Sequence, residues 1–203
     1  MKRFVIRYWQ HIAVAALSVA VFCYWMYLFP FIPVVREMSQ LFLWTGDYLV
    51  ERIILPGGLA QYLGEMISQC FINPLNAAIA YAIIFLVARQ LSGVWLRQFF
   101  PTLKVAYRFV LSLVVPAILW GIAMVPYIPL TLTVAVILVM GVGVLLNVEC
   151  GMWNVKCGTW NVLIAIPVMY WLTGPAAVLL VLCCIRWAPA TLTLFAACVI
   201  GSS

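Results

Sequence analysis

The amino-acid sequence predicts an all-α, polytopic membrane protein: a transmembrane helical bundle of six or seven spans with amphipathic helices in its first outer loop. Of the 203 residues, 67% are hydrophobic and only 8% are charged, whereas a soluble domain carries about 25% charged residues. The uncharged residues also gather in long runs, and one helix needs about 20 such residues to cross a bilayer. This composition excludes an ordinary soluble enzyme, a disordered chain and a nucleic-acid-binding protein.

The first two spans follow from uncharged runs in the first half of the chain. Tyr8–Val35 contains no formally charged residue, and its centre predicts a span over 12–31. Met66–Ala88 is the next uncharged run. Pro74 indicates that the second span begins at residue 75, and the predicted span is 75–91. The basic N-terminus resembles a secretory signal, but the apolar run is too long and lacks a small-residue cleavage site. We therefore expect an uncleaved signal anchor.

Two further spans are expected in the middle of the chain. Arg108 and Glu149 enclose 40 uncharged residues, which is enough for two helices. The two prolines of 125–129 remove backbone donors and favour a turn. The sequence therefore predicts spans over 109–125 and 130–146, joined by a tight hairpin.

The C-terminal region leaves two models open. A fifth span is expected over 160–172, ended by a Thr-Gly-Pro sequence. In the first model, 176–185 is a short sixth helix that ends at Arg186, and 188–200 begins a seventh. In the second model, 176–200 is one span with Arg186 near mid-membrane, where an arginine costs about 2.5 kcal/mol or more. We favour the first model for this reason.

The basic residues predict the orientation. A cytoplasmic N-terminus places nine of the eleven on the cytoplasmic side: Lys2, Arg3, Arg7, Arg89, Arg97, Lys104, Arg108, Lys156 and Arg186. Only Arg36 and Arg52 then lie outside. Cytoplasmic loops of membrane proteins carry an excess of Lys and Arg. We therefore expect a multi-pass inner-membrane protein with its N-terminus in the cytoplasm.

The outer loop, residues 34–74, is the only long segment outside the spans, and its pattern is helical. Helices are expected over 34–44, 48–55 and 59–70, with Asp47 as the N-cap of the second. A Pro-Gly-Gly turn precedes the third. The polar residues of the third helix share one face: Gln61, Glu65 and Gln69. We expect these helices to lie on the outer membrane surface with their apolar sides toward lipid.

Four charged residues of this loop form the candidate active site. Glu37 and Asp47 are candidate catalytic residues, because a carboxylate can act as general base on an acceptor hydroxyl. Arg36 and Arg52 are candidate phosphate-binding residues, because the planar guanidinium matches phosphate oxygens. The structural alternative is that Arg36 pairs locally, Asp47 caps a helix and the glutamates are solvated.

No cofactor or metal site is expected. His11 is the only histidine, and none of the seven cysteines forms a CxxC motif. A tandem repeat, 147–153 followed by 154–160, matches at five of seven positions and places Cys150 and Cys157 on nearly the same helix face. We expect this repeat to serve packing, with a binding stripe as the alternative. Phosphate-loop and zincin motifs are absent from the sequence.

Several short motifs resemble an uncharacterised family. They are Phe29-Pro30-Phe31, Arg36-Glu37, Gln40-Leu41-Phe42 and Pro56-Gly57-Gly58-Leu59-Ala60-Gln61-Tyr62. With these motifs, most of the chain resembles a family of multi-pass membrane proteins of Bacteroidota known only as a domain of unknown function. Members of that family are typically longer. The resemblance therefore implies that residues 1–203 are a single membrane domain, the N-terminal part of a longer architecture.

A looser resemblance is architectural. One span, a long outer segment with an early carboxylate, and then a run of spans with tight hairpins are similar to the membrane glycosyltransferases of the C superfamily. Those enzymes use polyprenyl-phosphate-linked sugars and a carboxylate in the first outer loop. The resemblance implies Glu37, and with less support Asp47, as the catalytic residue.

Two functions are therefore left open. One is a glycosyltransferase-like module that acts at the outer leaflet, with the lipid bilayer and a polyprenyl-phosphate-linked sugar as its partners. The other is a non-enzymatic membrane anchor or assembly subunit, whose outer loop docks a protein partner that the sequence does not identify. An enzyme requires Glu37 or Asp47 in a pocket beside a lipid-sized groove, and a docking subunit requires an exposed apolar patch on the loop. A transporter has less support, because no charged residue is confidently placed at mid-membrane.

The orientation can be tested by cysteine labelling in intact cells. We expect Arg52→Cys to react with a membrane-impermeant thiol reagent from the periplasm and Arg97→Cys to react only after the membrane is opened. The reverse pattern would contradict the predicted topology.

Overall fold

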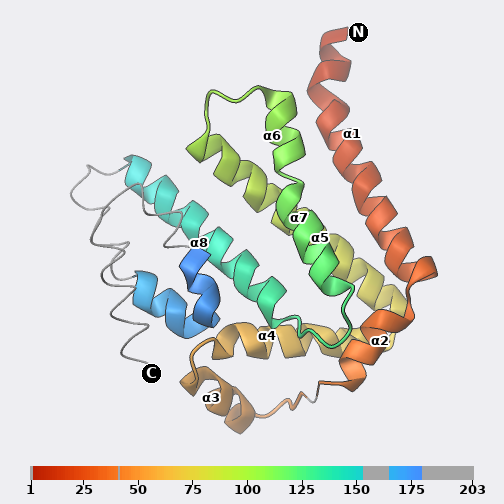
Figure 1. Ribbon diagram of the computed structural model, residues 1–203, viewed down its shortest axis with the longest axis vertical. Coiled ribbons are helices and arrows are strands. Elements are labelled where there is room, and N and C mark those ends of the chain that lie inside the picture. The colour runs from red at the N-terminus through yellow and green to blue at the C-terminus, as the bar shows by residue number, and fades with distance from the viewer. Residues whose placement is uncertain (1, 41, 153–164, 180–203) are drawn as a thin grey trace. The chain divides into compact units, whose positions relative to one another are not determined.

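The computed structural model describes residues 2–40, 42–152 and 165–179 (Figure 1). Every regular element in these ranges is a helix, and none is a strand. The predicted all-α class is therefore confirmed. The chain divides into two compact units, the first formed by Met1–Phe42 and Glu65–Pro129 and the second by Leu43–Gly64 and Leu130–Ser203.

The first unit is built around one long helix, α5 (Pro74–Phe99). Its other helical elements are α1 (Lys2–Cys23), the π-helix η1 (Tyr24–Leu28), α2 (Phe31–Met38), the 3-10 helix η2 (Gln69–Ile72), α6 (Val105–Leu111) and α7 (Val114–Ala123). Each of these elements packs against α5. The N-terminus of α5 is well defined, because the Asn73 side chain accepts from the Leu75 N–H and Pro74 occupies the first helical position.

Three helical segments are long and apolar enough to cross a membrane: Tyr8–Leu28, Pro74–Gln98 and Val105–Ala123. They overlap the first three predicted spans, 12–31, 75–91 and 109–125. Two further apolar helices, Thr131–Leu145 and Ala165–Leu179, are shorter, so a count of six or seven spans is not confirmed. The segments 180–185 and 188–200, on which the choice between one and two final spans depends, lie outside the described residues.

The third segment is interrupted. Between α6 and α7 the helix is broken at Ser112 and Leu113. Pro116 explains the break, because it has no N–H to donate to the Ser112 carbonyl four residues earlier and its ring crowds that carbonyl. The Ser112 hydroxyl instead donates to the Phe109 carbonyl at 2.7 Å.

The second unit contains α3 (Gly46–Ile54), the first turns of α4 (Gly58–Ser68), α8 (Thr131–Met152) and the helical segment Ala165–Leu179. α8 corresponds to the predicted fourth span, 130–146. The core of this unit is formed by Val139, Ile166, Met169 and Ala177, all buried. The tandem repeat begins in α8 and continues into residues that the structure does not describe.

The Pro-Gly-Gly turn at 56–58 is confirmed, and its backbone geometry requires glycine at 57 and at 58 for different reasons. Gly57 has φ +82° and donates its N–H to the Trp171 carbonyl at 2.7 Å. A Cβ on Gly57 would lie 3.3 Å from the Cα of Gly174, which also has positive φ. A Cβ on Gly58 would lie 1.7 Å from the Arg52 carbonyl oxygen. The turn therefore depends on backbone atoms that approach too closely for a side chain.

Two predictions about the first outer helices are wrong. The helix expected over 34–44 is α2, which runs from Phe31 to Met38. Pro33 fits there because the first N–H groups of a helix lack intrahelical acceptors. The N-cap of α3 is Thr45, whose hydroxyl accepts from the Tyr48 N–H at 3.3 Å, and not Asp47. Asp47 lies in the first turn, where its charge is favourable near the positive end of the helix dipole.

The helix expected over 59–70 is confirmed as α4 and η2, but its polar face does not point to water. Glu65 is only 7% exposed. The buried face of α4 follows its small residues Ala60, Gly64 and Ser68, which recur every fourth position. A Cβ on Gly64 would lie 2.7 Å from the Thr131 nitrogen. Close backbone packing therefore determines which side of α4 is buried.

We expect Gly58→Ala to lower the free energy of unfolding by about 3 kcal/mol, because the new methyl group overlaps the Arg52 carbonyl. Gly121→Ala is the control, since nothing lies within 4 Å of its added Cβ and alanine favours a helix by about 1 kcal/mol. Unfolding in mixed detergent micelles would measure both. Equal stability of the two variants would contradict this account of the turn.

Candidate functional site

The four predicted site residues lie on two helices. Arg36 and Glu37 are neighbours in α2 of the first unit, and Asp47 and Arg52 belong to α3 of the second. Arg36 is buried, Glu37 and Arg52 are half-buried, and Asp47 is exposed. The two members of each pair are positioned by their own helix.

The Arg36 guanidinium is the most completely engaged of these groups. It is 1% exposed. Its Nη1 donates to the Tyr81 hydroxyl, and its Nη2 donates to the carbonyls of Ala123 at 2.9 Å and Val125 at 2.8 Å. These contacts connect α2 to the N-terminal part of α5 and to the C-terminal end of α7. Arg36 therefore holds three elements of the first unit together.

The acceptors lie at the end of α7, where the last carbonyls of a helix have no intrahelical donors. Ala123 is its last residue, and Val125, whose carbonyl also accepts from the Ile128 N–H at 3.2 Å, lies just beyond it. The C-terminus of a helix also carries partial negative charge, which favours a cation there. Within the described residues, no carboxylate pairs with Arg36, so neutral oxygen atoms at a helix end take the place of a counter-ion. The Arg36 Nε is buried and has no partner among these residues.

Burial affects the titration of this arginine. It lowers the pKa of the Arg36 guanidinium, and the nearby Tyr81 hydroxyl opposes that shift. A guanidinium nevertheless stays charged in proteins because its ordinary pKa lies far above the physiological range. The positive charge is therefore permanent, and the surrounding oxygens must compensate for the water it has lost.

An aromatic cluster fixes the position of Tyr81. The Trp25 ring stacks on the Tyr81 ring with centroids 4.2 Å apart and an interplanar angle of 18°. The Phe71 ring lies on it at 5.1 Å. Trp25 is 1% exposed and Phe71 is 0% exposed. Because rings packed in this way leave little freedom of rotation, the Tyr81 hydroxyl is held in place to accept from Arg36.

The remaining predicted residues have fewer contacts. The Glu37 carboxylate makes no hydrogen bond or ion pair with any described residue. The Arg52 Nη2 donates to the Tyr48 hydroxyl at 2.9 Å, and the guanidinium lies 4.9 Å from the centre of the Tyr48 ring. Across the described ranges, no three histidine, cysteine or acidic side chains gather closely enough to hold a metal ion.

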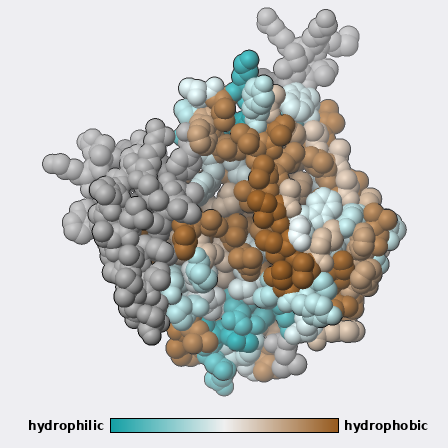
Figure 2. Space-filling model, viewed as in Figure 1, coloured by the Kyte–Doolittle hydropathy of each residue, from teal (hydrophilic) through white to brown (hydrophobic). Residues whose placement is uncertain are grey.

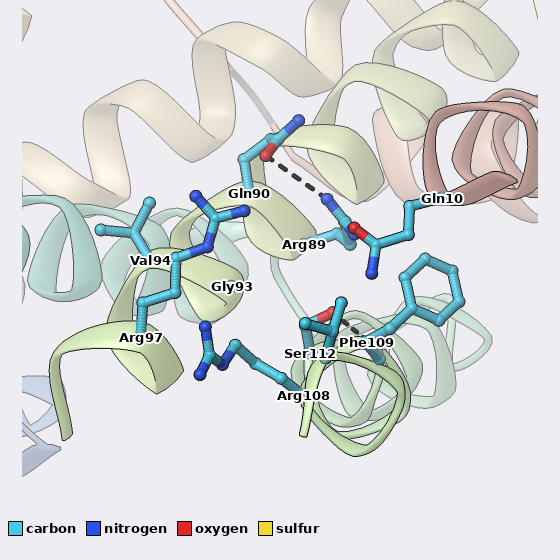
Figure 3. A pocket seen from close by; sticks show the side chains of 10 residues that line it. Gln10, Arg89, Gln90, Gly93, Val94, Arg97, Arg108, Phe109 and Ser112 are labelled. Carbon is cyan, nitrogen blue, oxygen red and sulfur yellow. Dashed lines mark hydrogen bonds between the residues drawn. The ribbon is translucent and has the colours of Figure 1, made fainter. Parts of the chain in front are cut away.

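A second group of charged residues was not predicted as a site. Arg89 and Arg97 of α5 and Arg108 of α6 surround a pocket of about 180 Å³ (Figure 3). Gln10 of α1, Gln90 and Ser112 complete its polar lining. In the sequence these arginines indicate only the orientation. Their spacing of eight residues on α5 is a usable signal, because it places Arg89 and Arg97 about 80° apart around the helix, within the width of one face.

The fold and this distribution of charge define a class. In the residues that the structure describes, the protein is all-helical, with three helices compatible with membrane insertion, a buried arginine of α2 that contacts the N-terminal half of α5, and an arginine-lined pocket at the C-terminal half of α5. It belongs to a family of unknown function, DUF6057, whose model matches residues 5–201. The uncharacterised family expected from the motifs is thereby confirmed as a family of unknown function. No curated protein and no solved structure matches the chain.

The role of Arg36 can be measured directly. We expect Arg36→Met to lower the free energy of unfolding by about 3 kcal/mol, because it leaves buried oxygens without donors. Arg36→Lys should restore only part of this loss, since one ammonium cannot reproduce the planar fork. Arg97→Met is the control, because this exposed side chain makes no hydrogen bond with the described residues, and it should change stability by less than about 0.5 kcal/mol. A stable, fully folded Arg36→Met variant would contradict the role assigned to Arg36.

Proposed function

We propose that the chain is a non-enzymatic membrane anchor or assembly subunit of the inner membrane, with its N-terminus in the cytoplasm. The observation that supports this function is the burial of Arg36. An enzyme acting on a lipid-linked sugar needs a cation available to the phosphate. Both Nη groups of Arg36 donate to oxygens inside the first unit, and the side chain is 1% exposed.

The outer segment is consistent with anchoring at a membrane surface. Helix α3 exposes acidic side chains along one edge, Asp47 and Glu51, and apolar side chains along the next, Val50 and Ile54. Val50 is 59% exposed and Ile54 is 67% exposed. A helix with one acidic and one apolar edge favours the boundary between headgroups and hydrocarbon, where the acidic edge contacts water and headgroups and the apolar edge contacts acyl chains. We therefore take lipid to be what covers the apolar edge of α3.

The orientation adds to this proposal. The basic residues of the sequence favour a cytoplasmic N-terminus. In that orientation α2 and α3 follow the first span on the outer side. The anchor would then present its short helices in the outer headgroup layer.

A second candidate function is the glycosyltransferase-like module acting on a polyprenyl-phosphate-linked sugar at the outer leaflet. One observation favours it. The Glu37 carboxylate follows the first candidate span closely, is half-buried, and makes no hydrogen bond or ion pair with the described residues. Such a carboxylate remains available as a general base. Asp47 would be the second catalytic candidate and Arg52 the phosphate-binding residue.

The two functions differ in the effect of Glu37→Gln. For an anchor, we expect a strain carrying this variant to match the parent strain in growth and in its lipid-linked sugars, as measured by mass spectrometry, while a deletion strain differs from both. The substitution removes one charge and keeps the shape of the side chain, so membrane insertion should not change.

Glu51→Gln is the matched control, because it removes another acidic side chain of the same segment that is exposed and is not a candidate catalytic residue. If Glu37→Gln inserts normally but accumulates the same lipid-linked sugar as the deletion strain, and Glu51→Gln does not, the enzyme replaces the anchor as the conclusion.

A further inference from the structure

The arginine-lined pocket carries three positive charges and no negative one. Arg89, Arg97 and Arg108 line it, and none of its described lining residues is acidic (Figure 3). Arginine side chains gathered at one pocket repel one another, and an anion placed among them removes this repulsion. The composition of the pocket therefore favours an anionic ligand.

The guanidinium groups also have N–H donors to spare. Arg97 is exposed and makes no hydrogen bond or ion pair with the described residues. The Nε atoms of Arg89 and Arg108 are buried without hydrogen-bond partners in the described structure. Buried donors are normally satisfied, and each unsatisfied one costs free energy. A ligand with several acceptor oxygens would satisfy donors of both kinds.

The arginines are held in place by their surroundings. The Arg108 Nη2 donates to the carbonyls of Pro101 at 3.1 Å and Leu103 at 3.0 Å, in the connection between α5 and α6. The Arg89 guanidinium lies 5.2 Å from the centre of the Phe109 ring, and its Nη1 is 3.4 Å from Gln90 Oε1. Two of the three cations are therefore positioned before a ligand binds, which reduces the entropy lost on binding.

Size and shape narrow the class of anion. The volume of about 180 Å³ is below the range of about 300 to 1,000 Å³ typical of sites for whole small molecules. It suits one compact group. Phosphate has several oxygens that match the fork of a guanidinium, and arginine is over-represented where phosphate is recognised. We propose that Arg89, Arg97 and Arg108 bind a phosphate group, as a lipid headgroup or as a free phosphate.

The surroundings of the pocket bear on the source of that phosphate. The pocket lies at the adjoining ends of two candidate spans, Pro74–Gln98 and Val105–Ala123. Exposed apolar side chains lie along α6 and α7, among them Val110, Val114 and Ile118, and Figure 2 shows an apolar band on the face of the molecule in view. A lipid whose phosphate occupied the pocket would have the apolar surface of the candidate spans beside its acyl chains. A free phosphate would make no use of that surface.

Two binding measurements with the whole chain test the proposal. Inorganic phosphate is titrated into the detergent-purified protein by calorimetry. Separately, the protein is reconstituted in phosphatidylcholine nanodiscs with and without phosphatidic acid, and retained lipid is counted by native mass spectrometry. We expect Arg97→Gln to weaken binding of whichever probe binds by about tenfold or more, the effect of losing a charged hydrogen bond. Arg89→Gln is a second variant with the same expected direction.

Lys104→Gln is the matched control, because Lys104 is an exposed cation next to α6 that does not line the pocket. It should change binding by less than about twofold, since it removes charge without removing a contact. Binding of phosphatidic acid alone assigns the pocket to a lipid headgroup, and binding of inorganic phosphate assigns it to a free phosphate or a phosphorylated solute. If neither probe binds, or if Lys104→Gln weakens binding as much as Arg97→Gln, the proposal is overturned.

Discussion

A permanently charged guanidinium that has lost its water constrains the first unit more than any other group. Burying an ion without compensation is costly, and the usual partner for arginine is a carboxylate. Arg36 instead donates to Tyr81 and to two carbonyls at the end of α7. The Ala123 carbonyl lies at the last residue of α7, and the Val125 carbonyl lies just beyond it, before Pro126, which has no N–H to continue a helix. The end of α7 therefore also supplies acceptors for a cation on another helix.

This arrangement also explains why the aromatic residues crowd around α5. Tyr81 can accept from Arg36 only if its ring is held still, and Trp25 and Phe71 pack on it. Trp25 comes from the π-helical turn η1, which ends the first candidate span. A π-helical turn is wider than an α-helical one and alters the direction of the side chains that follow. The end of the first candidate span, the last turn of α2 and the N-terminal part of α5 thus meet at Tyr81.

The sequence predicts the helical class and the positions of the first three spans, because both depend on local composition. It does not predict the burial of Arg36, whose carbonyl acceptors are 87 and 89 residues away in the chain. The sequence pattern places Glu65 on a polar face, because the large apolar residues of α4 predict its packing side. The small residues determine that side instead, since they permit the closest approach of neighbouring backbones. The arginine pocket forms because α6 packs back against α5. Arginines that in the sequence indicate only the membrane orientation are thereby brought together in one site.

The contact between Gly57 and Gly174 has a consequence for the order in which the chain folds. Both glycines belong to the second unit, yet the whole of Glu65–Pro129 is made between them. Chains grow at about 5 to 20 residues per second, so Gly57 is made roughly 6 to 23 s before Gly174. Contacts between such distant residues also form slowly because a long loop must close first. The second unit therefore cannot close at the turn of Gly57 until the chain has been made through Gly174.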